Sequence, residues 1–137
     1  MATPADYTAL IAQAIAARER AYCPYSGFAV GAAVLTASER LFPGCNIENA
    51  AYPATVCAER TALLSAYAAG EREIVAIAVV ADTSGPVSPC GTCRQVIHEL
   101  APHCAVLLAN LRGDIYRTTP QELLPGGFTG EDLPGKS

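Results

Sequence analysis

The sequence predicts an α/β fold with three layers (α/β/α), in which a mixed sheet of about five strands lies between helices. Two observations indicate this class. Short apolar runs typical of strands alternate along the chain with segments whose apolar residues recur at helical spacing. In addition, 51% of the 137 residues are hydrophobic, which is enough for one well-filled core. We therefore expect residues 1–137 to form a single domain, with no room for a second.

A helix and then a β-hairpin are expected at the start of the chain. Residues 6–21 carry apolar side chains at helical spacing. Residues 28–36 and 41–47 have the composition of strands, and a turn at residues 38–40 separates them. The sheet is therefore expected to be antiparallel at this point.

Two more helices are expected in the middle of the chain. Residues 58–69 are rich in alanine and leucine, and Gly70 ends the segment. Residues 91–100 form the other helix, and Pro89 suits its start. Each helix begins beside a cysteine, so each would present its positive N-terminal end to that residue.

Three further strands complete the expected sheet. Residues 74–81 and 105–109 are apolar and rich in β-branched side chains, which is typical of strands that are buried on both faces. Residues 115–118 are expected to add an edge strand, and the later part of the sheet to be parallel. Residues 126–137 contain several glycines and few apolar side chains, so we expect a tail that gains order against a partner subunit.

Three cysteines have the spacing of metal ligands. Cys90 and Cys93 are three residues apart, so on a helix they lie on one face and reach the same ion. Cys57 lies at the start of the preceding helix and supplies a third thiolate. A structural zinc normally has four protein ligands, whereas three ligands leave a position for a water molecule that the metal acidifies. The pattern therefore favours a catalytic zinc site.

Charged residues beside these cysteines have expected roles in the chemistry. Glu59 is two residues from Cys57 and projects away from it on a helix, so we interpret Glu59 as the general base rather than a ligand. Three thiolates on a divalent ion leave one excess negative charge. Arg60 and Arg94 are the candidates to offset that charge, because a guanidinium donates hydrogen bonds to sulfur and keeps its proton.

Two motifs together resemble the zinc signature of the cytidine deaminase family. They are the Cys-Ala-Glu-Arg segment that begins at Cys57 and the Pro-Cys-Gly-Thr-Cys-Arg-Gln segment that begins at Pro89. Residues 24–33, 44–52 and 122–125 also resemble segments of that family, so the likeness covers nearly the whole chain. The chain is similar to the branch that acts on free nucleosides and has three cysteine ligands. The resemblance implies the same α/β/α fold.

The resemblance also implies an activity and a cofactor. The expected reaction is hydrolytic deamination of cytidine, and of 2′-deoxycytidine, to the uridine product and ammonia, with one Zn²⁺ per subunit and a cellular role in pyrimidine salvage. Two alternatives stay open. One is a related zinc deaminase of a cytosine-containing antibiotic nucleoside, and the other is a binding module with structural zinc and no turnover.

The resemblance implies that four residues contact the nucleoside. Asn46 and Glu48 resemble the pair that binds the ribose hydroxyls, and in an extended segment they share a face and offer both donors and acceptors. Phe28 resembles an aromatic that packs against the pyrimidine, and the backbone of Ala58 resembles a contact to the base.

Subunit contacts are implied in the same way. Tyr52 and Phe128 resemble parts that complete a neighbouring subunit's pocket, and the resemblance implies a homotetramer with shared active sites. Residues 49–54 and 66–69 are rich in small side chains that let backbones approach closely. Core packing explains those alanines equally well, so the composition alone is a weak indication.

The overall composition argues against several other partners. The net charge is −4 and the pI is about 5.0, which gives no electrostatic attraction for nucleic acid. Tryptophan is absent and aromatic residues are 7%, so stacking on single strands is poorly supported and RNA or DNA editing is disfavoured. Neither a signal peptide nor a membrane-spanning run is expected, and metal-bound thiols suit a reducing compartment, which predicts a cytoplasmic protein.

Other cysteines and the histidines are expected outside the site. We interpret Cys23, Cys45 and Cys104 as buried small hydrophobic residues. His98 and His103 fall near the end of a predicted helix, where a surface or capping role is expected.

Overall fold

A five-stranded mixed sheet forms the middle layer of the computed structural model, which describes residues 4–135. Its strands are β1 Val30–Thr36, β2 Leu41–Cys45, β3 Ile74–Ala81, β4 Ala105–Asn110 and β5 Ile115–Thr118. Their order across the sheet is β2-β1-β3-β4-β5. β3 and β4 are parallel, and the other neighbouring pairs are antiparallel. The predicted mixed sheet is therefore confirmed. Its later part is parallel only between β3 and β4, because a short turn joins β4 to β5 and makes that pair antiparallel.

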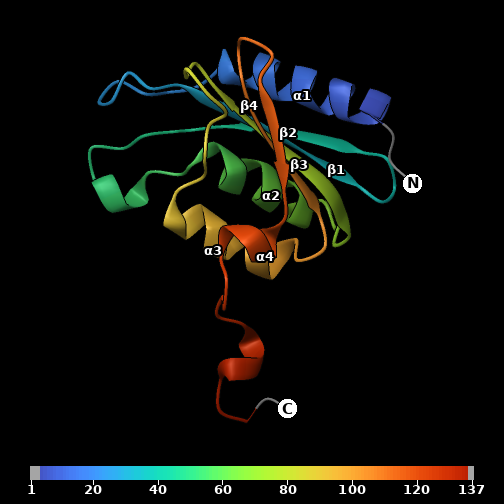
Figure 1. Ribbon diagram of the computed structural model, residues 1–137. Helices are drawn as coiled ribbons and strands as arrows, with labels where there is room; N and C mark the ends of the chain where they lie inside the picture. The colour runs from blue at the N-terminus through green and yellow to red at the C-terminus, as the bar shows by residue number, and fades with distance from the viewer. Residues whose placement is uncertain (1–3, 136–137) are drawn as a thin grey trace.

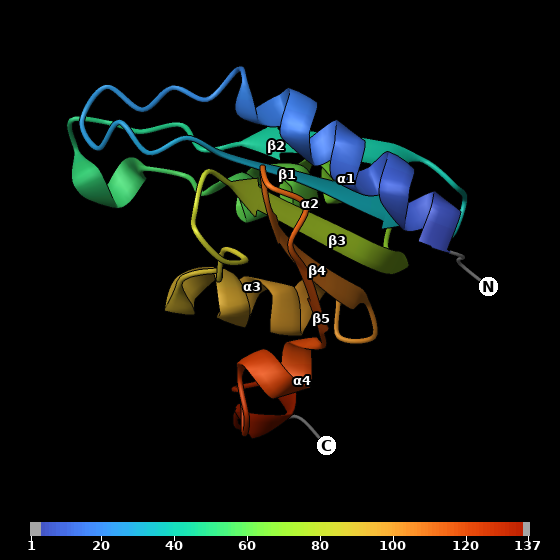
Figure 2. The same ribbon diagram turned by 45° about the horizontal axis from the view of Figure 1, so that its top comes forward.

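Helices cover both faces of this sheet (Figure 1). They are α1 Pro4–Arg18, α2 Ala58–Ala68, α3 Gly91–Leu100 and the short α4 Pro120–Leu123, with 3-10 helices at Tyr52–Ala54 and Gly130–Asp132. α1 lies on one face, and α2 and α3 lie on the other, as the two views show together (Figures 1 and 2). This arrangement is the predicted three-layer α/β/α fold. None of the helices within residues 4–135 is long and apolar enough to cross a membrane.

The two faces of β3 contribute to separate parts of the core. Ala78 and Val80 pack with Leu10 of α1 in one buried cluster. Ile77 and Val79 face the other way and pack with the helices α2 and α3 in a second cluster. Because side chains alternate across a strand, both faces of β3 must be apolar, which explains its unbroken hydrophobic run.

Hydrogen bonds from one side chain shorten the predicted hairpin. The amide of Asn46 donates to the carbonyl of Phe28 at 2.8 Å and accepts from the backbone N–H of Val30 at 2.9 Å. These bonds occupy backbone groups that a strand partner would otherwise use, so β1 begins at Val30 rather than at residue 28. β2 ends at Cys45, and Ile47 instead forms isolated bridges to Tyr22 and Val56.

Other helix and tail boundaries also differ from the sequence-based expectation. α1 ends at Arg18 instead of residue 21, because tight turns follow, such as the bond from Glu19 N–H to the Ala16 carbonyl at 3.2 Å. The short helix α4 was not predicted. Part of the predicted tail, residues 126–135, is described and includes the 3-10 helix Gly130–Asp132, whereas residues 1–3, 136 and 137 lie outside the described residues.

Gly44 sets how closely α2 approaches the sheet. A Cβ atom at this position would lie 2.5 Å from the backbone N of Ala62 and 2.7 Å from the carbonyl O of Ala58. Both are backbone atoms of α2 and cannot move away independently. Thr61 of α2 also donates to the Cys45 carbonyl at 3.0 Å. The first turn of α2 is therefore held directly against β2.

We predict that Gly44→Ala destabilises the protein by about 1–3 kcal/mol, because the added methyl group forces α2 away from β2. The measurement is urea unfolding at fixed protein concentration. Gly85→Ala is the matched control, because its Cβ would meet nothing within 4 Å. Equal unfolding midpoints for the two variants would contradict the prediction.

Candidate active site

Three thiols meet where the first turns of α2 and α3 face each other. Cys57 is the N-cap residue of α2 and Cys90 is the N-cap residue of α3, while Cys93 lies in the first turn of α3. Neither N-cap side chain makes a capping hydrogen bond, so both sulfurs are available for another partner. The sulfurs of the three residues all lie within 4.8 Å of one another. The helix N-termini also favour the thiolate form.

This cluster fits a zinc ion. Tetrahedral zinc with Zn–S bonds of about 2.3 Å requires sulfurs about 3.8 Å apart. The Sγ atoms of Cys57 and Cys90 are 3.9 Å apart. Within residues 4–135, the cluster consists of these two cysteines and Cys93, with no fourth protein ligand. Three ligands are the number that leaves a position for water or substrate.

Arg60 is the cation that the structure brings to the sulfurs. Its Nη2 atom donates to the Sγ of Cys57 at 3.6 Å and to the Thr55 carbonyl at 3.2 Å. Without metal, the pKa of Cys57 falls to about 5, because the Cys93 thiol donates a hydrogen bond to it and Arg60 adds another. The pKa of Cys93 is raised, since it keeps the proton that it shares with Cys57 and is buried.

Glu59 is a buried carboxyl group beside the thiols. It lies in the first turn of α2, and its side chain is 4% exposed. Burial raises its pKa, because the charged form loses water, and the nearby Cys57 thiolate adds to this effect. A carboxyl group with a raised pKa is suited to both accept and return a proton near neutral pH.

A cavity of about 300 Å³ opens beside this cluster. Cys57, Glu59 and Cys90 line it, and so do four residues that the sequence predicted as substrate contacts, namely Phe28, Asn46, Glu48 and Ala58. Sequence reasoning missed other lining residues, which are Ser26, Val30, Thr55, Val79, Val87 and Ser88. Sequence similarity could have indicated Ser26, Val30 and Ser88, because Ser26 and Val30 lie within a segment that resembles the family and Ser88 lies directly before one.

Hydrogen bonds hold the predicted ribose-binding pair at the cavity. The amide of Asn46 joins the Phe28 loop to β1, as described above. Glu48 accepts hydrogen bonds from the backbone N–H groups of Tyr25 and Ser26 at 2.9 and 3.1 Å, and from the Ser26 hydroxyl. These bonds lower the pKa of Glu48, the hydroxyl contributing most. The carboxylate is therefore charged and fixed in place.

Two predicted pocket residues lie outside the cavity of their own chain. Tyr52 is 71% exposed and packs edge-on against Tyr25, with ring centroids 6.1 Å apart. Phe128 is 54% exposed in the segment that follows α4. Neither residue lines the cavity.

Arg94 is directed to oxygen atoms rather than to sulfur. It donates to the Pro89 carbonyl, the Leu123 carbonyl and the Ser88 hydroxyl. Among the hydrogen bonds of residues 4–135, Arg60 is the arginine that donates to a cysteine sulfur. The two arginines proposed from sequence as charge partners therefore occupy different surroundings.

The remaining cysteines and histidines lie away from the thiol cluster. Cys104 is buried as predicted, whereas Cys23 and Cys45 are only half-buried, so their predicted full burial is wrong. Cys45 is the last residue of β2, and Cys23 lies in the loop between α1 and β1. His103 is exposed, and His98 packs against Gly127.

An open three-thiol metal site beside a buried carboxyl group and a cavity is the arrangement of a zinc-dependent hydrolytic enzyme. Comparison with known proteins identifies the family. Residues 4–109 match the model of the cytidine and deoxycytidylate deaminase zinc-binding region. The chain belongs to this family of zinc-dependent deaminases.

Individual relatives are similar to this chain in sequence or in structure over most of its length. It is 59% identical to the cytidine deaminase of Halalkalibacterium halodurans over 129 residues, 93% of this chain and 98% of the relative. It resembles a crystal structure of cytidine deaminase from Burkholderia pseudomallei with a TM-score of 0.87 and 54% identity, covering 89% of this chain and 98% of the other. Blasticidin-S deaminase from Bacillus cereus is 35% identical over 108 residues, 73% of this chain and 76% of the relative.

We predict that iodoacetamide modifies Cys57 far faster than Cys104 in the metal-free protein at pH 6.5. Alkylation requires the thiolate, and Cys57 has a pKa of about 5 whereas burial raises the pKa of Cys104 to about 12. Peptide mass spectrometry after timed labelling is the measurement, and zinc loading should protect Cys57. Equal labelling of the two cysteines would show that the predicted thiolate is absent.

Proposed function

We propose that this protein converts cytidine and water to uridine and ammonia. The observation that carries the proposal is the buried carboxyl group of Glu59, which lines the same cavity as the thiols of Cys57 and Cys90. The family membership and the high identity to cytidine deaminases support the same reaction. A cavity of about 300 Å³ is of the size that small-molecule sites have.

Cys57, Cys90 and Cys93 would hold the zinc ion, which would lower the pKa of a water molecule and so make it a better nucleophile near neutral pH. Glu59 accepts the proton of that water and delivers it to N3 of the ring as C4 is attacked. The same carboxylate then takes the proton of the new hydroxyl group on C4 and transfers it to the amino group, so that the C4–N bond breaks, ammonia leaves and C4 becomes a carbonyl. The raised pKa of Glu59 supports this role, since one group must both take and give protons.

Substrate contacts follow from the cavity lining. We propose that Glu48 and Asn46 bind the ribose hydroxyls, because both line the cavity and keep unused acceptor or donor capacity. Phe28 is 44% exposed at the cavity and offers its ring to the pyrimidine. The backbone of Ala58 lies between Cys57 and Glu59, where the base must approach. 2′-Deoxycytidine is proposed as a second substrate.

Charge compensation is proposed for Arg60. Its guanidinium contacts Cys57, which supports the expectation that it offsets the excess negative charge of three thiolates. Arg94 makes its bonds elsewhere, so the same role is not supported for it. The proposed setting is pyrimidine salvage in the cytoplasm, where a reducing environment keeps the thiols available for metal.

An antibiotic nucleoside is the second candidate substrate. The similarity to blasticidin-S deaminase is the observation in its favour. The identity to the cytidine deaminase of Halalkalibacterium halodurans is much higher and extends over more of the chain. Ordinary cytidine is therefore the favoured substrate, and turnover of both compounds by one preparation distinguishes the two. A purely structural zinc is disfavoured by the absence of a fourth ligand within residues 4–135.

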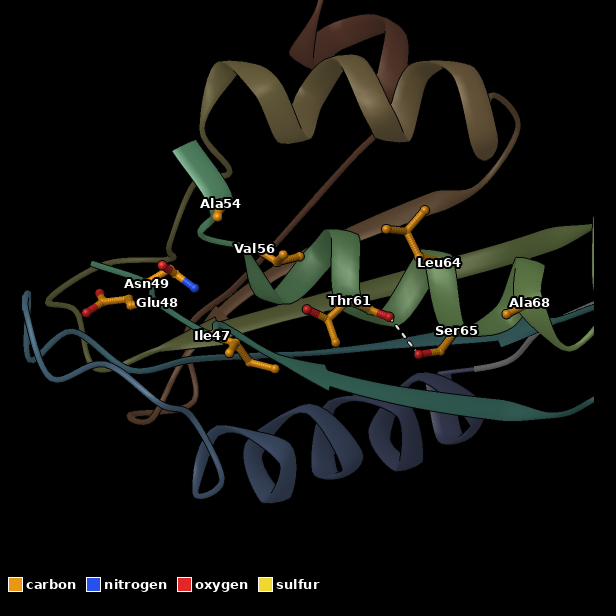
Figure 3. Close-up of a pocket in the computed structure, with 9 residues that line it drawn as sticks. All are labelled: Ile47, Glu48, Asn49, Ala54, Val56, Thr61, Leu64, Ser65 and Ala68. Carbon is orange, nitrogen blue, oxygen red and sulfur yellow. Dashed lines mark hydrogen bonds between the residues drawn. The ribbon is translucent and has the colours of Figure 1, made fainter. Parts of the chain in front are cut away.

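Self-association into a homotetramer is proposed as well. A groove of about 390 Å³ lies between α2 and residues 47–56, and Figure 3 draws the residues that line it. Two of them, Leu64 and Ile47, are 51% and 45% exposed. Asn49, Ala54 and Ala68 line it, and they come from the two small-residue segments that the sequence indicated as contact regions. An exposed apolar groove of this kind suits contact with a second copy of the chain.

The first test is Glu59→Gln with zinc content measured alongside. We expect the variant to keep zinc and to lose activity on cytidine by at least about a thousandfold, because the amide cannot accept and return the proton. The assay follows the change in absorbance as cytidine becomes uridine. Zinc-loaded wild-type protein that leaves cytidine unchanged would refute the proposed function, and an active Glu59→Gln variant would refute the role of Glu59.

Shared active sites are tested by mixing variants. Phe128→Ala should raise KM for cytidine, because Phe128 is exposed on its own chain and is proposed to enter a neighbour's cavity. Co-expressed Glu59→Gln and Phe128→Ala subunits should recover activity, since mixed assemblies contain sites with an intact Glu59 and an intact Phe128. Sedimentation velocity gives the assembly state. A stable, active monomer, or no recovery in verified mixed assemblies, would contradict shared sites.

A further inference from the structure

We propose that Arg94 is a positioning residue that ties the wall of the substrate cavity to the C-terminal segment of the same chain. The inference rests on the proposed function, because it concerns the cavity in which cytidine is to bind. Arg94 lies in α3 directly after Cys93. Its Nε donates to the Pro89 carbonyl at 2.9 Å, its Nη2 to the Ser88 hydroxyl at 2.6 Å, and its Nη1 to the Leu123 carbonyl at 2.8 Å.

These three bonds require the shape of a guanidinium. Three different nitrogen atoms of one planar group donate to oxygen atoms of Ser88, Pro89 and Leu123. The first two residues are adjacent, and Leu123 is far from them in the sequence. A lysine has the same charge but a single nitrogen on a flexible side chain, so it cannot donate all three hydrogen bonds in this geometry. The contacts therefore depend on geometry, whereas compensation of thiolate charge would depend on charge.

Two of the three bonds, those to Ser88 and Pro89, hold the wall of the cavity. Ser88 lines the cavity, and Pro89 is the residue before Cys90. Residues 82–90 contain no helix or strand, and the Val87 N–H bonds to the Ala109 carbonyl only at the long distance of 3.4 Å. Asn110 holds the start of this loop through the carbonyls of Thr83 and Ser84, and the two bonds from Arg94 hold its end.

The third bond of Arg94 holds Leu123, the last residue of α4, directly before the segment that carries Phe128. Gln95, the next residue of α3, donates to the Phe128 carbonyl at 3.0 Å. One turn further on, His98 packs so closely against Gly127 that a Cβ there would lie 2.7 Å from its Nε2. Side chains of α3 therefore dock the segment that carries Phe128, and Arg94 joins this docked segment to the cavity wall.

The test compares Arg94→Lys with Arg94→Gln in the zinc-loaded protein. Positioning predicts that both variants raise KM for cytidine about tenfold while kcat changes less than about twofold, because loss of charged hydrogen bonds loosens the wall. A charge role predicts that Lys restores wild-type kinetics and Gln lowers kcat. Arg112→Lys is the matched control, since Arg112 is exposed on the turn between β4 and β5.

Hydrogen exchange supplies a readout that does not need activity. Arg94→Lys should speed exchange in peptides that cover residues 84–90 and 123–128 together, with no change in β3. If the variant does not fold, Ser88→Ala is the substitute, because it removes only the bond between Arg94 and the Ser88 hydroxyl. It should speed exchange in residues 84–90 alone. Wild-type exchange or wild-type KM in Arg94→Lys overturns the proposal. An inactive wild-type protein refutes the proposed function instead, and exchange then decides the role of Arg94.

Discussion

The site depends on holding three sulfur atoms about as close together as a single zinc ion requires. Thiolates repel one another, so this closeness needs opposing positive charge and a rigid frame. Two helix N-termini provide part of the charge, because Cys57 and Cys90 are the N-cap residues of α2 and α3, and Arg60 provides more. The frame is the sheet, against which Gly44 lets α2 lie in backbone contact.

Placement of the first turn of α2 fixes the rest of the chemistry. Glu59 is carried on that turn and is buried with it, so the same packing that places Cys57 raises the pKa of the carboxyl group. Asn46 joins the Phe28 loop to β1, and Asn46 and Phe28 line the same cavity as Glu59. The thiol cluster and the buried carboxyl group are thus positioned by helices that pack on one sheet, and the cavity wall is completed by the loop before β1.

Much of the fold was predictable from the sequence, because periodicity and spacing are local. α3 and the strands β3 and β5 have the expected bounds, and the three cysteines meet as their spacing indicated. The start of β1 was mispredicted, since a side-chain amide from Asn46 takes the place of a strand partner. The bonds of Arg94 were also missed, because they reach across the fold to Leu123, and no local pattern indicates such a contact. Tyr52 and Phe128 are exposed in the single chain, so their contacts to a neighbouring subunit stay a prediction.

The closeness of Cys57 and Cys90 has a consequence for the metal-free chain. Their sulfurs are 3.9 Å apart, and Cys57 is largely a thiolate at neutral pH, so an oxidant meets a reactive sulfur with a neighbour at hand. A disulfide needs the sulfurs to move to about 2.05 Å and would consume two ligands at once. Zinc held by both sulfurs would keep them from forming this disulfide. A preparation that loses metal in air is therefore expected to bind zinc again only after a thiol reductant is added.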